Sequence, residues 1–438
     1  MIPILICDGR VPAEMRRLST PPMGHHLPVR MLAWLPRRTW IVLALVVVAL
    51  LGWLVVYLHG PNDHGDITLY HRYALAFWTG PRPLRSLPAE YPLLSVIPFS
   101  LTLLPPLPDT VTVFALWMLV LLVAGLAAMT RRESPRVAEV CAVYLAVGGF
   151  ATLLGRYDLV PAAITVAAYW TARERRFTLA YALVAAGTLL KLYPGLLLPL
   201  VALEQYRALG RDPLRSLPPW PVLAGVALCG GLVASGFAAA RLLDPADWLG
   251  PLAYNAHRPI QIESVPATLL WASGLAGFRV SPNRSFHSYN LVGPLAQPIG
   301  LAAEVAMVLG LLWVYWRTAA GRLDLGRGMA ACLLVVICTG RVLSPQYLAW
   351  FLPLVAIVER DWDVAWLLVG AATTLVFPFA YREVHPVGSG PPPEFPLPLL
   401  GAIALRNVLL VAAAVRFLRR PGARSEAEPR RLSRAPVA

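Results

Sequence analysis

Long apolar runs separated by short polar stretches dominate the chain. The first run covers 38–58 and has the length of about 20 residues that crosses the hydrocarbon core of a bilayer. Shorter apolar runs are interpreted as broken or re-entrant helices, which protein or a watery cavity must cover. Together the runs predict an all-α polytopic membrane protein with about 11 to 13 transmembrane or re-entrant helices. The later runs cover 91–130, 137–154, 157–172, 177–190, 193–206, 219–240, 291–316, 328–341, 344–359, 362–380 and 397–417.

The first polar stretch, 59–90, has a helical pattern of its own. Apolar side chains recur three and then four residues apart at Tyr70, Tyr73 and Phe77, with Leu69 beside the first of them. This spacing predicts an amphipathic helix lying on the membrane surface. Asp66 stands just before these residues, where a carboxylate can cap the helix and meet its positive end. If the surrounding helices enclose it, the same carboxylate is costly and points to a function.

Composition narrows the class of protein. A mean hydropathy of +0.60, with 57% hydrophobic and only 14% charged residues, excludes a soluble domain, in which about a quarter of residues are charged. The net charge of +14 is therefore attributed to membrane topology and not to nucleic-acid binding. The cysteines, mostly within apolar runs, predict no disulfide, and no His/Cys spacing predicts zinc.

The basic residues predict the orientation and the domain limits. Most of them fall in segments predicted to lie on the same side of the membrane as the N-terminus. An excess of basic residues is typical of the cytoplasmic side. We expect disordered basic cytoplasmic tails at 1–37 and 418–438, flanking a transmembrane domain at 38–417 of a multi-pass plasma-membrane protein. Its main outer segments are the first outer loop, 59–90, and the long outer loop, 241–290.

Charged residues gather at helix ends on the predicted outer face, and simple structural roles compete with functional ones. Arg156 and Asp158 are interpreted first as an internal ion pair, and Arg258 with Glu263 as a salt bridge that orders the long outer loop. Lys191 can extend its ammonium to the interface. It is also the one lysine among 38 basic residues, and a compact ammonium suits phosphate.

Five motifs occur in order along residues 65–350. They are Asp66 through Tyr70, Tyr73 and Gly80 to Glu90-Tyr91-Pro92, Gly155-Arg156-Tyr157-Asp158, Lys191-Leu192-Tyr193-Pro194, Arg258-Pro259-Ile260-Gln261-Ile262-Glu263-Ser264 and Ser344-Pro345-Gln346-Tyr347-Leu348. Together they are similar to the motifs of glycosyltransferase family 87, a family of the GT-C superfamily. No one motif is diagnostic, and the chain departs from the pattern at Leu93, where relatives often carry a second proline.

The resemblance implies an inverting transfer of a sugar, usually mannose, from a polyprenyl-phosphate donor to a hydroxyl of a glycan or glycolipid at the outer membrane face. Such a transfer needs a general base and cationic groups at the departing phosphate. The resemblance gives the role of base to Asp66, with Asp63 in reserve. It implies no metal and no cofactor, and we expect membrane lipids as the other partners.

The remaining outer residues divide into two predicted groups. The donor phosphate is expected to contact cationic or imidazole side chains, and the sugar or acceptor is expected to contact aromatic, amide and carboxylate side chains. The predicted phosphate contacts are Lys191, Arg258, Arg341 and His257. The predicted sugar or acceptor contacts are Tyr70, Glu90, Tyr91, Asp158, Gln261, Glu263 and Gln346.

Two other functions also fit a membrane protein of this kind. A transporter or flippase of lipid-linked sugars would use broken helices and intramembrane charges as well. It predicts polar groups near the middle of the apolar runs and internal repeats, whereas these runs are nearly free of charge and show no clear repeat. A non-catalytic membrane scaffold would leave the outer polar clusters without a ligand. The enzyme is therefore the favoured interpretation.

Overall fold

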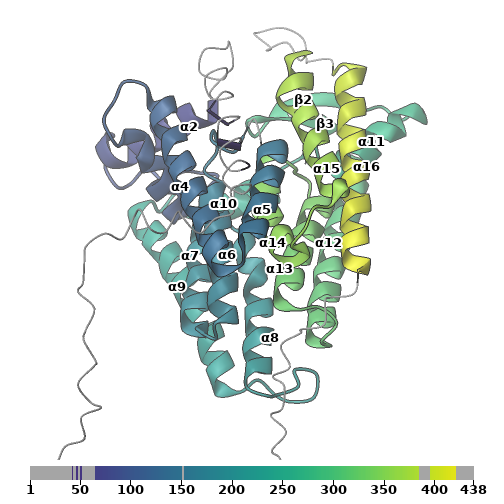
Figure 1. The fold of residues 1–438 in the computed structure, drawn as a ribbon. Helices are drawn as coiled ribbons and strands as arrows, with labels where there is room; N and C mark the ends of the chain where they lie inside the picture. The colour runs from purple at the N-terminus through teal and green to yellow at the C-terminus, as the bar shows by residue number, and fades with distance from the viewer. Residues whose placement is uncertain are drawn as a thin grey trace, which may run out of the picture.

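The computed structural model describes residues 65–149, 152–383 and 395–420, together with positions 42, 46–47 and 50–51 of the first predicted crossing. Predictions for the N-terminal tail, for Asp63 and for most of the first crossing and C-terminal tail lie outside these residues. Within them the fold is a bundle of helices with a small sheet at one end (Figure 1).

The helices follow the predicted apolar runs closely. Helix α7 occupies the residues predicted for it, and the predicted composite run 91–130 is three short turns followed by one long helix. The first half of the bundle consists of α2 (Gly65–Thr79), η2 (Leu93–Ser95), α3 (Val96–Ser100), η3 (Leu101–Leu103), α4 (Thr110–Arg132), α5 (Pro135–Gly148), α6 (Leu159–Arg173), α7 (Phe177–Leu190), η4 (Tyr193–Leu197), α8 (Leu198–Ala208) and α9 (Trp220–Leu243).

The second half contains the strands as well as helices. It consists of α10 (Gly250–Ala256), β1 (Ile260–Gln261), α11 (Val265–Leu275), β2 (Ser281–Ser285), β3 (Ser288–Val292), α12 (Ala296–Ala319), α13 (Leu325–Thr339), η5 (Pro345–Tyr347), α14 (Leu348–Glu359), α15 (Val364–Thr374), η6 (Leu375–Phe379), η7 (Ala380–Glu383) and α16 (Leu397–Arg419).

Helix length and hydropathy support a membrane protein. Among the described residues, α4, α9, α12 and α16 are long and apolar enough to cross a bilayer. The other apolar helices are shorter, and several continue through a 3₁₀ or π turn, as at η4 before α8 and η5 before α14. Proline lies in each of these turns, in agreement with the predicted breaks. The predicted class, an all-α polytopic membrane protein, is confirmed.

Helix α14 lies at the centre of the core. Every residue from Leu348 to Ile357 is buried, as expected of a helix that is apolar on all sides and surrounded by others. It packs against α5, α6 and α13. Because α14 begins directly after η5, this packing fixes the position of Gln346, Tyr347 and Trp350 at its outer end.

Helix α2 confirms the predicted amphipathic helix but corrects its environment. Its apolar face, formed by Ile67, Tyr70, Ala74 and Phe77, is buried in the protein, and the ring of Tyr70 stacks on Phe99 at 4.4 Å. The helix therefore lies against the bundle through its apolar face and not against lipid. The sequence could not distinguish these surfaces, because both favour the same helical spacing.

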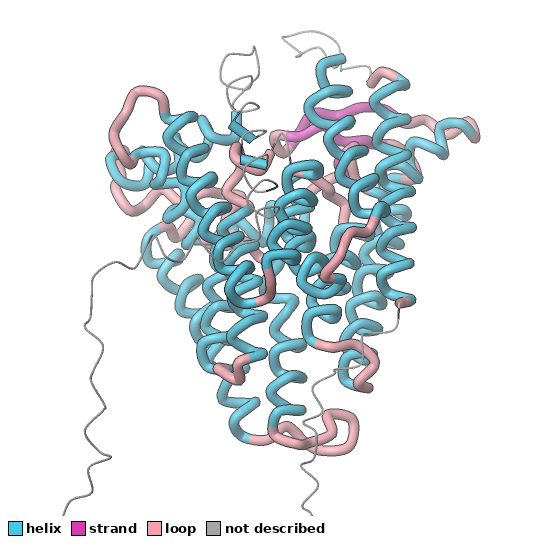
Figure 2. Tube along the Cα trace, in the orientation of Figure 1, coloured by secondary structure: helices cyan, strands magenta, loops and turns pink. Residues whose placement is uncertain are grey.

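The small sheet was not predicted. Its order is β1-β3-β2, and both pairs are antiparallel, with Gln261 opposite Asn290. The strands lie near the same end of the bundle as α2 and α11 (Figure 2). Phe286 and His287 make the turn between β2 and β3 with positive φ angles of 54° and 50°, a turn usually made by asparagine or glycine. The segment therefore lacks the usual sequence signal of a hairpin.

Candidate functional site

Asp66 lies in the first turn of α2 and forms an ion pair with Arg156. Arg156 lies in the turn before α6, far away in the sequence. The contact between these segments is fixed by aromatic packing, because the ring of Tyr70 meets that of Tyr157 edge to face at 5.5 Å. The Asp66 side chain is 30% exposed and the Arg156 side chain 25% exposed, so water or a substrate can still reach the pair.

This arrangement corrects the predicted pair between Arg156 and Asp158. The Asp158 carboxylate is instead 2.6 Å from Nζ of Lys191, and its side chain is only 3% exposed. Because Arg156 and Asp158 lie two residues apart in a turn, their side chains meet different partners. The chain thus places two ion pairs, Asp66 with Arg156 and Asp158 with Lys191, on either side of Tyr157.

Lys191 lies in an aromatic cage. Its ammonium is 5.0 Å from the ring centres of Tyr157 and Trp350 and 5.3 Å from that of Tyr347. A cation facing aromatic rings at such distances is stabilised by the ring quadrupoles. The side chain is 16% exposed, so Lys191 turns into this cage and does not extend to the interface, the simple structural role considered for it.

The backbone around Lys191 explains why the ammonium points inwards. Helix α7 ends at Leu190, and Lys191 itself is extended, with φ −158° and ψ 134°. The chain then turns back through η4, where a Cβ added to Gly187 would lie only 2.9 Å from Cβ of Pro194. The glycine therefore allows η4 to pack against α7 and holds Lys191 at the helix end.

Trp350 completes the buried part of the cage. Its indole Nε1 donates to Oδ1 of Asp158 at 2.6 Å, the oxygen that Lys191 also contacts. The other carboxylate oxygen, Oδ2, is buried and has no hydrogen-bond partner among the described residues. Buried carboxylate oxygens normally have a partner, so the lone pairs of Oδ2 are an unused acceptor in this cluster.

Substituting Trp350 with phenylalanine is expected to destabilise the protein by about 1.5–3 kcal/mol, because a hydrogen bond to a buried charged group is lost. Thermal unfolding of the purified protein in detergent measures the change. Trp220, 78% exposed, provides the control, since its replacement by phenylalanine should leave the unfolding midpoint unchanged. Equal effects at the two positions would contradict the role of the Asp158 hydrogen bond.

Glu90 and Tyr91 join the same region from the end of the first outer loop. Tyr73 donates to Oε2 of Glu90 at 2.7 Å, and burial together with this carboxylate raises the pKa of the Tyr73 hydroxyl. The Tyr91 ring meets that of Tyr157 at 5.4 Å. Across the loop, His287 lies 3.6 Å from Glu90. The β2–β3 hairpin therefore contacts the first outer loop.

Arg258 and His257 follow α10 and differ in their surroundings. The guanidinium of Arg258 lies over the ring of Tyr254 at 5.4 Å, and its Nε is buried without a hydrogen-bond partner among the described residues. His257 is exposed and turns back to the carbonyl oxygen of Ala253 at 2.8 Å. Of these two predicted phosphate contacts, Arg258 has the unused donor.

Gln261 and Glu263 are buried and are held by protein partners. Gln261 accepts from the backbone N–H of Leu343 at 3.1 Å and donates to Glu263 at 3.3 Å. Glu263 lies 3.6 Å from Arg406 of α16 and accepts from the hydroxyl of Tyr381 at 3.0 Å. The predicted salt bridge between Arg258 and Glu263 is therefore wrong, because the fully buried Arg406 takes that carboxylate.

Arg341 and Gln346 flank the break before α14. The Nε of Arg341 is 2.9 Å from the carboxylate of Glu304 on α12. Arg341 would therefore have to contact Glu304 and a phosphate with the same guanidinium. The Oε1 of Gln346 is buried and has no partner among the described residues. Gln346 thus keeps an unused hydrogen-bond acceptor.

The structure therefore brings together Asp66, Tyr70, Glu90, Tyr91, Asp158 and Lys191 around Tyr157. It gives Gln261, Glu263 and Arg341 protein partners, and leaves His257 exposed. Trp350 and Arg156 were missed as parts of the site by sequence reasoning. Trp350 follows Tyr347 by three residues, the spacing that places two side chains on one helix face, and this pair was the available signal. Within the described ranges, no group of three or more His, Cys, Asp or Glu side chains could hold a metal ion.

The family model described as glycosyltransferase family 87 matches residues 90–345. The chain belongs to glycosyltransferase family 87. The matched region contains Glu90, Asp158, Lys191 and Arg258, whereas Asp66 precedes it and Gln346 follows it. No curated protein matches the chain. As a family 87 protein with long apolar helices, it is a membrane glycosyltransferase.

Proposed function

We propose that this family 87 protein transfers a sugar, mannose by resemblance to the family, from a polyprenyl-phosphate donor to a hydroxyl acceptor with inversion of configuration. The reaction takes place on the outer face of the membrane, the side that carries fewer basic residues in the sequence. The observation that supports the proposal best is the meeting of Asp66 with Arg156 beside the Asp158–Lys191 pair, because the reaction requires a carboxylate and cations near one another.

Asp66 serves as the general base. It accepts the proton of the acceptor hydroxyl as the hydroxyl oxygen forms a bond to the anomeric carbon of the sugar. The bond from that carbon to the phosphate oxygen breaks, and its electron pair leaves with the polyprenyl phosphate. Base catalysis of this kind contributes about 10²–10⁴-fold to rate. Its partial exposure lets Asp66 contact an acceptor that arrives from water.

Arg156 and Lys191 bind the phosphate group. A guanidinium has five N–H donors, so Arg156 can bind Asp66 and a phosphate oxygen at once. Lys191 uses one donor on Asp158 and has two others. Negative charge grows on the phosphate as the sugar bond breaks, and positioned cations stabilise that charge. Arg258, with its free Nε, is the third cation proposed for this group.

The sugar itself lies among the unused acceptors of the site. Asp158 Oδ2 and Gln346 Oε1 are buried without hydrogen-bond partners among the described residues, and sugar hydroxyls are suitable donors for both. Tyr91 provides an aromatic wall, since its ring already packs against Tyr157, whereas Tyr70 lies buried behind these rings and supports them. This combination of two acceptors and aromatic surfaces favours a hexose over an apolar ligand.

A reconstituted assay tests the proposal. The purified full-length protein in vesicles is supplied with a labelled mannosyl polyprenyl phosphate and with an extract of cell-envelope glycans or glycolipids as acceptors. We expect label to appear in an acceptor with inverted anomeric configuration. Movement of the intact donor across the membrane without any sugar transfer would overturn the proposal in favour of a transporter. Retained configuration in the product would overturn the direct role of Asp66 as base.

A further inference from the structure

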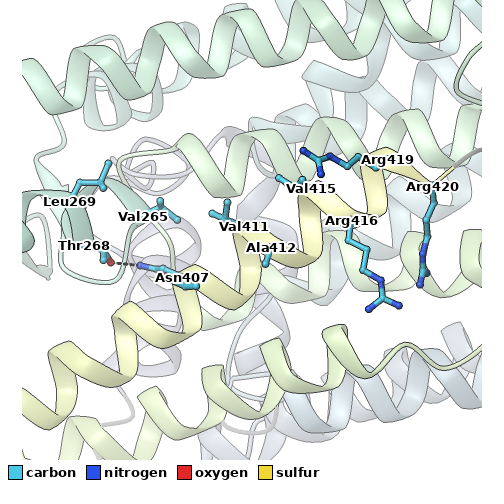
Figure 3. Close-up of a pocket in the computed structure, with 11 residues that line it drawn as sticks. Val265, Thr268, Leu269, Asn407, Val411, Ala412, Val415, Arg416, Arg419 and Arg420 are labelled. Carbon is cyan, nitrogen blue, oxygen red and sulfur yellow. Dashed lines mark hydrogen bonds between the residues drawn. The ribbon is translucent and has the colours of Figure 1, made fainter.

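A large groove lies between α11 and α16, and no residue of the proposed catalytic site lines it. Its volume is about 930 Å³. One wall consists of Val265, Thr268 and Leu269 of α11, and the groove continues along α16 to three arginines at the end of that helix (Figure 3). The other wall consists of Arg420, which caps the end of α16, and of the α16 residues Asn407, Val408, Val411, Ala412, Val415, Arg416 and Arg419.

The groove is apolar along its length and open to its surroundings. Val408, Val411 and Val415 lie on one face of α16 at helical spacing, and Leu269 of α11 is 59% exposed. Val408 is 64% exposed. Short valine and alanine side chains leave the space between the two helices unfilled. An open apolar surface of this kind on a membrane helix is a surface for a hydrocarbon chain.

The polar ends of the groove set its length. Asn407 donates to Oγ1 of Thr268 at 2.7 Å and to the carbonyl oxygens of Glu263 and Ser264 at 3.1 and 3.0 Å, so its amide closes the inner end. The apolar stretch from Asn407 to Arg416 rises about 14 Å at 1.5 Å per residue. Half of a hydrocarbon core is about 15 Å thick. The length of the groove thus matches the thickness of the hydrocarbon region of one leaflet.

The other end of the groove is positively charged. Arg416 and Arg420 are partly neutralised by Asp363, at 3.3 and 2.8 Å, and Arg420 also by Glu359 at 2.6 Å. Arg419 is exposed and extends beside Val415, whereas Arg416 and Arg420 point to the opposite side of α16 (Figure 3). Three arginines against two carboxylates leave a net positive charge at the depth of the lipid headgroups.

We propose that this groove binds an anionic glycerophospholipid of the bilayer. One acyl chain lies along Val408, Val411, Ala412 and Val415, and the headgroup phosphate accepts hydrogen bonds from Arg419. A hydrocarbon chain explains the apolar wall, and the phosphate explains why the wall ends in arginines. The proposal is independent of the sugar-transfer reaction, because the groove shares no lining residue with that site.

Native mass spectrometry of the purified full-length protein provides the test, with phosphatidylglycerol and phosphatidylcholine of identical acyl chains as the two probes. Wild type is expected to retain phosphatidylglycerol in preference. Because a basic residue at the headgroup contributes about 1 kcal/mol, Arg419→Gln should weaken phosphatidylglycerol binding about fivefold. Phosphatidylcholine should be weakened less, because its choline cation already offsets the charge of its phosphate. Ala412→Trp, which fills the groove, should abolish retention of both lipids.

Two matched controls separate the groove from general effects of substitution. Arg211 is exposed on the α8–α9 connection and Leu405 is 52% exposed on α16 outside the groove, so Arg211→Gln and Leu405→Trp should bind lipid as wild type does. Equal retention of phosphatidylglycerol by wild type and Ala412→Trp would overturn the proposal. So would equal weakening by Arg419→Gln and Arg211→Gln.

Competing occupants give different results. Displacement of bound phosphatidylglycerol by polyprenyl phosphate at equal concentration would assign the groove to the donor lipid and overturn the proposal. A chain shortened after Arg420 that gains lipid binding absent from wild type would assign it to the C-terminal segment 421–438, and would also overturn it. Inorganic phosphate alone should not displace the lipid, because it lacks the chain that fills the apolar wall.

Discussion

Replacing Asp66 with asparagine is expected to lower the turnover of sugar transfer by about 10²–10⁴-fold, the usual contribution of a general base. Asparagine keeps the size of the side chain but cannot accept the acceptor proton at neutral pH. Donor binding should be retained, because Arg156 and Lys191 remain. The measurement is the steady-state rate of labelled product formation in vesicles at saturating donor, together with the donor KM.

The loss of the ion pair with Arg156 could by itself disturb the fold, so a comparison is needed. Arg156→Gln breaks the same pair but leaves the carboxylate, and it should raise the donor KM more than it lowers turnover. Asp247 is an exposed carboxylate of the long outer loop, and Asp247→Asn should keep wild-type turnover. Unchanged turnover in Asp66→Asn, with a wild-type unfolding midpoint, would remove Asp66 as the base.

Replacing Lys191 with methionine is expected to destabilise the protein by about 3–5 kcal/mol, the cost of leaving one member of a buried ion pair without its partner. The Asp158 carboxylate is 3% exposed and would keep only the Trp350 hydrogen bond on its charged oxygen. Thermal unfolding in detergent measures the loss. We also expect the donor KM to rise, because the phosphate loses a cation.

The double variant Lys191→Met with Asp158→Asn distinguishes the two effects. It removes the buried charge as well as its partner, so the unfolding midpoint should recover most of the loss, whereas donor binding should stay weak. Arg211→Met removes an exposed cation and should change neither quantity. Full recovery of donor binding in the double variant would show that Lys191 acts only in structure and would contradict its assignment to the phosphate.

Much of the fold could be predicted because each apolar helix is visible in the sequence as a continuous run of apolar residues. The predicted run 177–190 is helix α7, and the prolines predicted as breaks lie at η4 and η5. Hydrophobic burial acts on every residue of such a run, so a local pattern carries the information. No such pattern indicated the β2–β3 hairpin, because its strand β2 is largely polar and its turn residues are phenylalanine and histidine.

The partners of the charged residues were harder to predict. The sequence indicated that Asp66, Asp158 and Lys191 would lie on one face, but it paired Arg156 with Asp158 and Arg258 with Glu263. The structure instead pairs Arg156 with Asp66, Asp158 with Lys191, and Glu263 with Arg406. Ion pairs form across helices whose packing the sequence does not state, and neighbours in a turn diverge. Trp350 was missed for the same reason, since its partner Asp158 lies on another helix.

The β2–β3 hairpin has a consequence for how the outer loops move. It joins the long outer loop to the first outer loop through the contact of His287 with Glu90 at 3.6 Å. The hydroxyl of Tyr254 donates to the carbonyl oxygen of Phe286 at 2.7 Å and ties the turn of the hairpin to α10. These contacts contribute about 1–2 kcal/mol, and the rest of the hairpin is held by the pairing of β3 with β1 and by the burial of Leu291. The hairpin therefore couples the end of the first outer loop to α10 and to the small sheet, and the two outer loops are expected to move as one body.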